Sequence, residues 1–227
     1  MTDFIVVDCE TTGTEDTDEV VEVAAARLDF IGEITEIYSS LVQPTIPIPP
    51  EASAIHHITD EMVAGAPRLG SVLGEVEMGG SLFVAHNVRF DRRYLSLSGD
   101  WICTYKLALQ VWPDAPGHSN QVLRYWLGLE GPPPEAGHPH RALYDVFVTA
   151  RLFQRIMETA RLSTDEMIAI SAQPALLPCF RFGKHANVPI SEVPRDYLRW
   201  IVEKSAAGED FDEDVIHTAR HHYERRS

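Results

Sequence analysis

Two carboxylates, Asp8 and Glu10, come directly after a short apolar run near the start of the chain. Side chains alternate along a strand, so both carboxylates face one side of a strand predicted there, and Cys9 faces the other. Two negative charges at this spacing suppress each other's ionisation unless a cation lies between them. Mg²⁺ and Mn²⁺ prefer such hard oxygen ligands. The pair therefore indicates a metal site, although Asp-x-Glu alone is also typical of a solvated strand end.

A third carboxylate, Asp91, follows a second apolar run, which predicts a strand over residues 82–85. We predict a helix over residues 87–97, which places Asn87 and Asp91 one turn apart on the same helix face. Three arginines put positive charge around this carboxylate: Arg89, Arg92 and Arg93. Surface Asp–Arg pairs would give a similar pattern, but a short strand that delivers Asp91 to the edge of a sheet favours a site.

A fourth carboxylate, Asp145, lies on a long amphipathic helix predicted over residues 141–160. It borders the core-facing row of this helix, where a carboxylate is costly unless it is paired or binds a metal. Pro139 prevents the helix from beginning earlier and leaves His140 in the loop at its entrance. An imidazole on a loop beside an acid held on a helix is suited to a general base that activates water.

The elements that must position these groups follow from the apolar periodicity. The predicted strands cover residues 4–7, 20–28, 34–42, 82–85 and 101–103. Short connections join the first three strands, which favours an antiparallel meander, whereas the later strands alternate with helices. Further helices are predicted to begin at Thr59, Thr104, Ser119 and the capping box Ser163-x-x-Glu166. The sequence therefore predicts an α/β fold with a mixed five-stranded sheet flanked by helices.

The chain is predicted to divide into three parts. Residues 1–162 form the main domain, residues 163–178 a helix and a linker, and residues 179–227 a small C-terminal unit. The hydrophobic fraction of 44% in 227 residues is sufficient for a sizeable core in the main domain. We therefore expect the predicted carboxylates and His140 to lie in one domain.

The overall charge argues in a different direction. With 34 acidic residues against 19 Lys and Arg, the net charge is −15 and the pI is about 5.0. Taken alone, this disfavours nucleic acid or an anionic membrane as a partner, because both are negative. The three cysteines form no CxxC pair, no apolar run reaches the ~18 residues of a membrane span, and the first residues carry no basic targeting segment. We expect a soluble, reduced, cytoplasmic protein without membrane contact.

Taken together, the acids and the histidine resemble the motifs of the DnaQ-like 3′→5′ exonucleases, whose acids occur in the order Asp-Glu-Asp-Asp with a final His. Residues 8–13 match the first motif, residues 85–91 the second and residues 140–145 the third. Residues 55–59 resemble the family's substrate-contacting segment, with His57 where a Gly is usual. Likeness outside these motifs, as in Trp101-Ile102-Cys103-Thr104, favours a subgroup that degrades DNA.

The resemblance implies an RNase H-like fold and an enzyme that hydrolyses nucleoside monophosphates from DNA 3′ ends, in single strands or frayed duplexes, with two Mg²⁺ or Mn²⁺ ions. It implies that Asp8 bridges the two ions and that Glu10 and Asp145 complete the shell of the first. Asp91 then holds the second ion, and His140 takes a proton from the attacking water. The implied substrate-contacting residues are Thr11, Thr12, His56 and Asn87.

Several alternatives stay open at this point. A ribonuclease or a polymerase proofreading exonuclease of the same family would carry the same five residues, and an inactive module would bind nucleic acid only. A zinc hydrolase could use His138, His140 and the pair His221–His222, but no third ligand stands at a recognisable spacing. Two roles are open for the aromatic residues of the C-terminal unit. They form the core of the unit, or they stack on bases beside its Lys and Arg side chains: Phe180, Phe182, Tyr197 and Trp200. The oligomeric state is open.

The distribution of charge removes the conflict with a nucleic-acid substrate. Residues 1–37 carry a net charge of −10, whereas residues 84–112 and residues 180–200 each carry +2. The acid excess is thus concentrated at the first strands, and two divalent ions there would add four positive charges where a phosphate must lie. We expect modest, salt-sensitive affinity for long duplex DNA.

Overall fold

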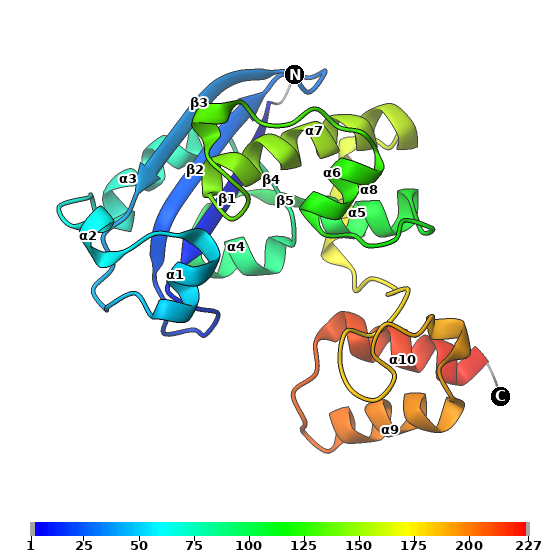
Figure 1. Cartoon of the computed structure of the whole chain (residues 1–227). Helices are drawn as coiled ribbons and strands as arrows, with labels where there is room; N and C mark the ends of the chain where they lie inside the picture. Colours follow the sequence, from blue (N-terminus) through cyan, green and yellow to red (C-terminus); the bar gives the residue numbers. More distant parts are fainter. Residues whose placement is uncertain (1–2, 226–227) are drawn as a thin grey trace. The chain divides into compact units, whose positions relative to one another are not determined.

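The computed structural model describes residues 3–225, so the ends of the predicted ranges, residues 1–2 and 226–227, lie outside the described residues. The chain forms two compact units, of which one ends at Ser171 and the other begins at Ala172 (Figure 1). We call them the N-terminal unit and the C-terminal unit. The break falls at the end of a helix, within the segment 163–178 that the sequence indicates as a connection.

The N-terminal unit is built on a five-stranded sheet in the order β3-β2-β1-β4-β5. Its strands are β1 (Phe4–Thr11), β2 (Val20–Leu28), β3 (Ile34–Leu41), β4 (Leu82–Ala85) and β5 (Asp100–Cys103). The first three strands pair antiparallel, while β4 is parallel to β1 and β5 is parallel to β4. The predicted mixed sheet, with an antiparallel meander at its start, is confirmed.

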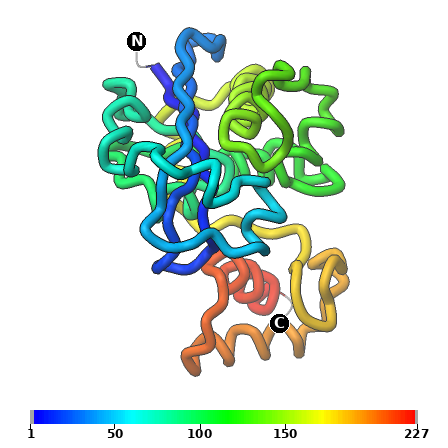
Figure 2. Tube along the Cα trace, turned by 60° about the vertical axis from the view of Figure 1, so that its left-hand side comes forward, coloured from blue at the N-terminus to red at the C-terminus, as the bar shows by residue number. Residues whose placement is uncertain are grey.

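Helices cover both faces of this sheet. They are α1 (Pro50–His56), α2 (Asp60–Val63), α3 (Leu69–Glu77), α4 (Val88–Tyr94), α5 (Thr104–Val111), α6 (Asn120–Trp126), the 3₁₀ turn η1 (Pro134–Ala136), α7 (Ala142–Ala160) and α8 (Thr164–Ala172). Helices α5 to α8 pack on one face, and α3 and α4 on the other. Figure 2 shows the blue strands between these two layers.

The alternation along β1 decides which side chains reach which layer. Phe4 and Val6 belong to the core under α7, whereas Ile5, Val7 and Cys9 belong to the core under α3 and α4. Each strand residue points to the face opposite to that of its neighbour, so Asp8 and Glu10 continue the row that faces α7. The predicted opposite orientation of Cys9 is confirmed. The strand is four residues longer than predicted, because it stays paired with β2 as far as Thr11.

The helix predicted over residues 87–97 is shorter in the structure. It begins at Val88 and ends at Tyr94, and Asn87 precedes it with a left-handed backbone at φ 68°. Asparagine tolerates this conformation better than most residues. Asn87 and Asp91 are therefore not two positions on one helix face, as predicted; Asn87 forms the sharp turn between β4 and α4.

The C-terminal unit contains the 3₁₀ turn η2 (Ile190–Glu192) and two helices, α9 (Arg195–Ala206) and α10 (Glu213–Arg225). Phe180 and Tyr197 are buried in its core, whereas Trp200 stacks on Tyr197 and stays 39% exposed. Of the two roles considered for the aromatic residues, the core role therefore holds for Phe180 and Tyr197. Within residues 3–225 we find no helix with the length and apolar character needed to cross a membrane.

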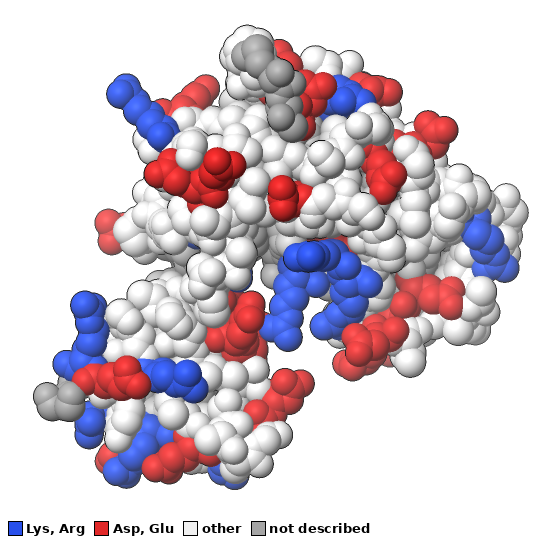
Figure 3. All heavy atoms as spheres, turned by 180° about the vertical axis from the view of Figure 1, so that it is seen from behind, with Lys and Arg blue, Asp and Glu red and all other residues white. Residues whose placement is uncertain are grey.

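Acidic and basic side chains are mixed over the face of the molecule shown in Figure 3, where the N-terminal unit also carries a compact group of basic side chains. Helix α4 of this unit contributes three exposed arginines: Arg89, Arg92 and Arg93. The net charge of −15 is therefore an average over a surface with local positive regions. Such regions are where a polyanion would be attracted in spite of the overall charge.

Candidate active site

The four predicted carboxylates come from three elements that meet near the end of β1. Asp8 and Glu10 lie on β1, Asp91 lies on α4, and Asp145 lies in the first turn of α7. Because β1 is the central strand and the two helices cover its opposite faces, the fold brings together residues that are far apart in the sequence. Ligand atoms of Glu10, Asp145 and His140 lie within 4.8 Å of one another.

The acids of this cluster are difficult to ionise together. Burial raises the pKa of Asp8 well above its ordinary value, and the neighbouring carboxylates raise it further, Asp91 most of all. Burial is also the main reason that the pKa of Glu10 rises to about 8 and that of Asp91 to about 7. Burial raises the pKa of Asp145 as well. Four hard oxygen donors that repel one another in a buried site fit divalent cations, which would remove this repulsion.

Asp91 is held by the backbone of β1. Its Oδ1 accepts a hydrogen bond from the Cys9 backbone N–H at 3.2 Å and lies 3.6 Å from the Cys9 Sγ. These two contacts lower the pKa of Asp91 and partly offset the effect of burial. Arg93, which we expected beside this carboxylate, instead pairs with Asp16 at 3.5 Å and donates to the Thr14 carbonyl at 2.5 Å. For Arg93 the prediction is wrong, because its side chain extends toward the loop after β1.

His140 is exposed and lies in the loop that leads into α7, as predicted. Its backbone N–H donates to the Asp145 Oδ2 at 2.8 Å, so the loop is bound directly to a site carboxylate. The other oxygen of Asp145, Oδ1, accepts a hydrogen bond from the Gln121 side chain at 3.3 Å. Asp145 thus holds the histidine loop on one side and is oriented by α6 on the other.

The two threonines of the first motif are buried: Thr11 ends β1, and Thr12 begins the turn that follows it. The Thr12 backbone N–H donates to the Glu19 carbonyl at 2.9 Å, and the Thr12 hydroxyl donates to Asp18 at 2.8 Å. The Thr11 hydroxyl donates to the Gly13 carbonyl at 2.5 Å. Both residues therefore shape the backbone beside the acids, and the donors of Thr12 are used within the loop.

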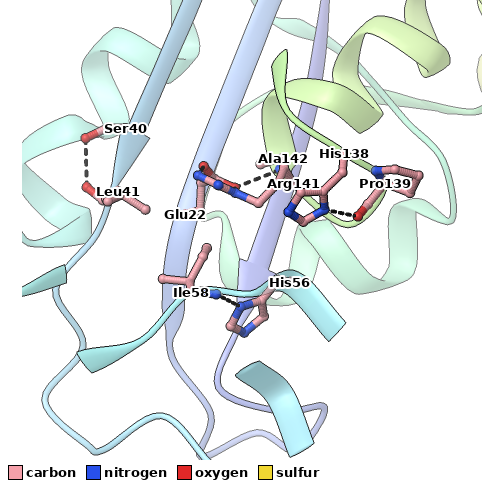
Figure 4. A network of polar contacts seen from close by, with 9 residues as sticks. All are labelled: Glu22, Ser40, Leu41, His56, Ile58, His138, Pro139, Arg141 and Ala142. Atoms are coloured by element: carbon pink, nitrogen blue, oxygen red, sulfur yellow. Dashed lines mark hydrogen bonds and ion pairs between the residues drawn. The ribbon is translucent and has the colours of Figure 1, made fainter. Parts of the chain in front are cut away.

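His56 combines burial with an unused polar atom. Its side chain is 2% exposed, and Nδ1 accepts a hydrogen bond from the Ile58 backbone N–H at 3.0 Å (Figure 4). Burial lowers the pKa of His56, so the ring is neutral near pH 7 and the proton resides on Nε2. Within residues 3–225 the Nε2 has no hydrogen bond of normal geometry, although the Thr11 backbone is near enough to the ring to oppose part of the fall in the pKa. A buried donor without a partner is costly, and a ligand oxygen would satisfy it.

Three residues of the predicted motifs adopt the left-handed backbone region: His57 at φ 58°, His140 at φ 64° and Asn87 at φ 68°. This region costs a non-glycine residue about 1–2 kcal/mol, and such strain concentrates at functional sites. His57, where related sequences usually have Gly, therefore keeps the glycine-like turn. Its ring packs edge-on against His138, with 4.8 Å between the ring centroids.

Sequence reasoning missed one buried ion pair next to the site. Glu22 on β2 is 3% exposed, and both of its carboxylate oxygens bind Arg141, at 2.9 Å from Nε and 2.5 Å from Nη2 (Figure 4). Glu22 also lies directly opposite Glu10 in the pairing of β1 with β2. The available signal was a single acid inside an otherwise apolar strand, which requires a partner.

The zinc alternative finds no support in the described part of the chain. The cluster found there that could hold a metal ion joins His140 to two carboxylates and contains neither His138 nor the pair on α10, His221 and His222. The His138 Nδ1 lies 2.8 Å from the Pro139 carbonyl. A site dominated by carboxylates suits harder cations than a histidine site does.

Comparison with known proteins agrees with this geometry. The family model described as "Exonuclease" matches residues 5–153, and the chain belongs to this family, which confirms the DnaQ-like resemblance. Exodeoxyribonuclease 10 of Escherichia coli K12 is 41% identical over 201 residues, which cover 86% of this chain and 89% of that protein. The DNA polymerase III subunit epsilon of Aquifex aeolicus is 32% identical over 168 residues, which cover 68% of this chain and 80% of that one.

A solved structure is also similar to this chain. It is that of Exonuclease X in complex with 5′ overhanging duplex DNA, which is 39% identical and superposes with a TM-score of 0.69. The match covers 74% of this chain and 99% of that one. The expected likeness to a subgroup that degrades DNA is therefore confirmed, and that subgroup is the one of exodeoxyribonuclease X. Enzymes of this family use divalent metal ions, and the acid cluster is a candidate site for them.

Proposed function

We propose that this exonuclease removes nucleoside monophosphates from the 3′ ends of DNA, with two Mg²⁺ or Mn²⁺ ions at the acid cluster. The observation that carries the proposal is the convergence of Asp8, Glu10, Asp91 and Asp145 on one end of β1, with His140 at its edge. The choice of DNA rests on the exodeoxyribonuclease relative, which matches 86% of this chain.

The carboxylates would divide the two ions between them. Asp8 is the residue whose pKa responds to all the other site acids, which suits a ligand shared by both ions. Glu10 and Asp145 would complete the ligands of the first ion, and Asp91 would hold the second ion. When bound, the pair of ions supplies an activated water and stabilises the charge on the attacking and leaving oxygens.

His140 is the residue proposed to accept a proton from the attacking water. A general base must come within hydrogen-bond distance of that water, and the His140 ring lies beside two carboxylates that would bind the ions. Its left-handed backbone and its N–H bond to Asp145 hold the ring at the edge of the acid cluster. The exposed ring can release the proton to solvent after each turnover.

Four further residues are proposed to contact the terminal nucleotide. The buried Nε2–H of His56 is a donor for a sugar or phosphate oxygen. Asn87 is exposed at the turn before α4, beside the element that carries Asp91. Thr11 and Thr12 would contribute through the backbone turn that they shape. The solved relative holds duplex DNA with a 5′ overhang, and its recessed 3′ end is the substrate geometry that we propose here, besides single strands and frayed ends.

The decisive experiment measures Mg²⁺-dependent release of mononucleotides from a 3′-labelled DNA oligonucleotide. Asp8→Asn and His140→Ala should each lower the rate by at least about 10²-fold. Asp114→Asn, which changes an exposed acid outside the site, is the matched control and should keep full activity. A matched RNA oligonucleotide in the same assay tests the choice of DNA. Undiminished activity in both site variants would overturn the proposal, and faster RNA cleavage would make the protein a ribonuclease.

We further propose that residues 1–162 are the exonuclease domain and that residues 179–227, which lie within the C-terminal unit, contact substrate or a partner. Trp200 is half-exposed and stacks on Tyr197, and the Lys184 ammonium lies 5.5 Å from the same Tyr197 ring, which supports a DNA contact. Trp200→Ala should weaken binding of a single-stranded oligonucleotide about tenfold. Phe30→Ala, at an exposed aromatic residue of β-turn 29–32, is the control.

We also propose that the protein works in the reducing cytoplasm. All three cysteines are free, and two of them, Cys9 and Cys103, are buried. Unpaired thiols are usual in reducing compartments. Fractionation of cells that produce the tagged protein would test this location, and recovery from an oxidising compartment would contradict it.

A further inference from the structure

The carboxylate of Glu22 has more donors than an ordinary ion pair provides. Besides the two bonds from the Arg141 guanidinium, its Oε2 accepts a hydrogen bond from the Ala142 backbone N–H at 2.9 Å. The Glu22 side chain is 4% exposed and that of Arg141 24% exposed, so little water competes with these bonds. A bidentate Arg–carboxylate pair also fixes the relative orientation of its partners more strictly than a single bond does.

This bonding pattern separates Glu22 from the metal-binding acids. Its two oxygens already accept three hydrogen bonds, and the Arg141 guanidinium already supplies the positive charge that this buried carboxylate needs. Glu10, its neighbour across the strands, instead shares a small volume with Asp145 and His140. Glu22 therefore lies beside the site without belonging to its ligand set.

The pair is attached to the segment that carries the proposed general base. Arg141 follows His140 directly and is the last residue before α7, and Ala142 is the first residue of that helix. The helix bond from the Asp145 N–H to the Arg141 carbonyl, at 3.0 Å, continues the connection to a site carboxylate. Two attachments thus bracket His140: its own N–H is bound to Asp145, and the next two residues are bound to Glu22.

We propose that Glu22 and Arg141 are positioning residues, whose buried pair holds the entrance of α7 against β2 and thereby holds His140 at the edge of the acid cluster. The inference rests on the proposed role of His140 as the base. It accounts for a strained backbone at His140, because φ 64° persists only where the surroundings impose it. It also accounts for the use of Arg rather than Lys, since only the guanidinium reaches both oxygens.

The test compares kcat and KM of the full-length protein on a 3′-labelled DNA oligonucleotide, below the melting temperature of every variant. Glu22→Gln should lower kcat by about 10²-fold and leave KM within about threefold, because a displacement of about 1 Å at a catalytic group has that effect. Arg141→Lys, which keeps the charge but loses the fork, should lower kcat about tenfold. Added guanidinium should partly restore Arg141→Ala. Arg155→Lys, in the surface pair with Glu158, is the matched control and should be unchanged.

A second measurement does not depend on activity. In metal-free protein labelled with ¹⁵N-histidine, the His140 ring signal, assigned by its loss in His140→Ala, should shift in Glu22→Gln and in Arg141→Lys but not in Arg155→Lys. An unchanged kcat and an unchanged His140 signal in both pair variants would overturn the inference, whatever their melting temperatures. If the signal shifts while Asp8→Asn remains fully active, the positioning is real and the proposed function is the part that fails.

Discussion

Glu10 on β1 and Glu22 on β2 lie directly opposite each other, but the groups that surround the two carboxylates differ. Glu22 is bound by the Arg141 guanidinium and by a backbone N–H, so its negative charge has a complete set of donors. Glu10 has other carboxylates as neighbours, and burial together with Asp145 raises its pKa to about 8. The same side chain is therefore a structural anchor or a candidate metal ligand, depending only on which groups face it.

The Glu22–Arg141 pair also affects the pKa of Glu10. The Arg141 guanidinium partly opposes the rise in the pKa of Glu10, whereas the Glu22 carboxylate adds to it. The ion pair thus places a positive and a negative charge beside the acid cluster and leaves its net charge nearly unchanged. The repulsion among the site carboxylates would therefore have to be neutralised by bound cations. Four measurements distinguish the paired acid, Glu22, from the acids of the site.

The largest difference is expected in activity. Glu10→Gln removes one negative charge from the proposed ion shell, and we expect kcat to fall by about 10³-fold, near the upper end for loss of one electrostatic group. This loss should exceed the one expected for Glu22→Gln, because Glu22 acts through another residue. The 3′-labelled oligonucleotide assay measures both. Equal losses in the two variants would contradict the distinction between ligand and anchor.

The thermal stability of these two variants should change in the opposite order to their activity, with Glu22→Gln the less stable of the two. Glu22→Gln leaves the buried Arg141 guanidinium without its charged partner, and we expect a loss of about 2–3 kcal/mol, or about 5–10 °C in Tm. Glu10→Gln removes an acid that the metal-free protein can bury at neutral pH only by keeping its proton, and it should raise Tm by about 2–4 °C. Thermal unfolding in EDTA measures both. Glu36→Gln, at an exposed acid of β3, is the control and should stay near the wild type.

The metal-free protein should lose stability as the pH rises. The pKa of Glu10 is about 8 in the folded state against an ordinary value of 4.5, and that of Asp91 is about 7 against 3.8. Folded protein thus keeps protons that the unfolded chain releases near pH 4 to 5, so this stabilisation is present at low pH and is lost up to about pH 8. Thermal unfolding in EDTA from pH 5 to 8.5 should show the decline.

Two changes should flatten that pH dependence. Glu10→Gln removes one of the titrating groups, and saturating Mg²⁺ or Mn²⁺ holds the carboxylates ionised in the folded state. The ions should also bind more tightly as the pH rises, because they displace protons. A slope that is identical in wild type and Glu10→Gln would show that the decline has another origin.

The smallest effect is expected at the residue that orients a site acid from outside the cluster. Gln121→Ala removes a single hydrogen bond of 3.3 Å to Asp145, which is worth about 1 kcal/mol, so kcat should fall about fivefold. The loss should be smaller than that for Glu22→Gln, because Asp145 keeps its bond from the His140 N–H. A loss above about 10²-fold would place Gln121 among the residues that contact substrate.

The sequence allowed the site acids to be predicted because each of them breaks a local pattern. Asp8 and Glu10 follow an apolar strand with period two, and Asp145 borders the apolar row of a long helix. Strand and helix periodicity depend on neighbouring residues only, so these positions are visible without a fold. The motif spacing then indicated the family, which the comparison with known exonucleases confirmed.

Contacts between distant segments could not be predicted in this way. Glu22 and Arg141 are 119 positions apart, and nothing in the local pattern of either residue names the other. The side chain of Arg93 was expected near Asp91 because the two are neighbours in sequence, yet it extends toward the loop after β1. Side chains of neighbouring helix residues diverge, and the packing of the surrounding elements decides where each one ends.

The sequence alone thus determined that the sheet is mixed and five-stranded, and it predicted which residues bind metal and which histidine acts as the base. Only the tertiary structure decided which buried acid is paired and which is left to a cation. The physical reason is that the free energy of a buried charge depends on the donors within a few ångströms. Here those donors come from β1, from α6 and from the residues at the entrance of α7. Burial and neighbouring charge are properties of the folded chain, and they distinguish Glu10 from Glu22.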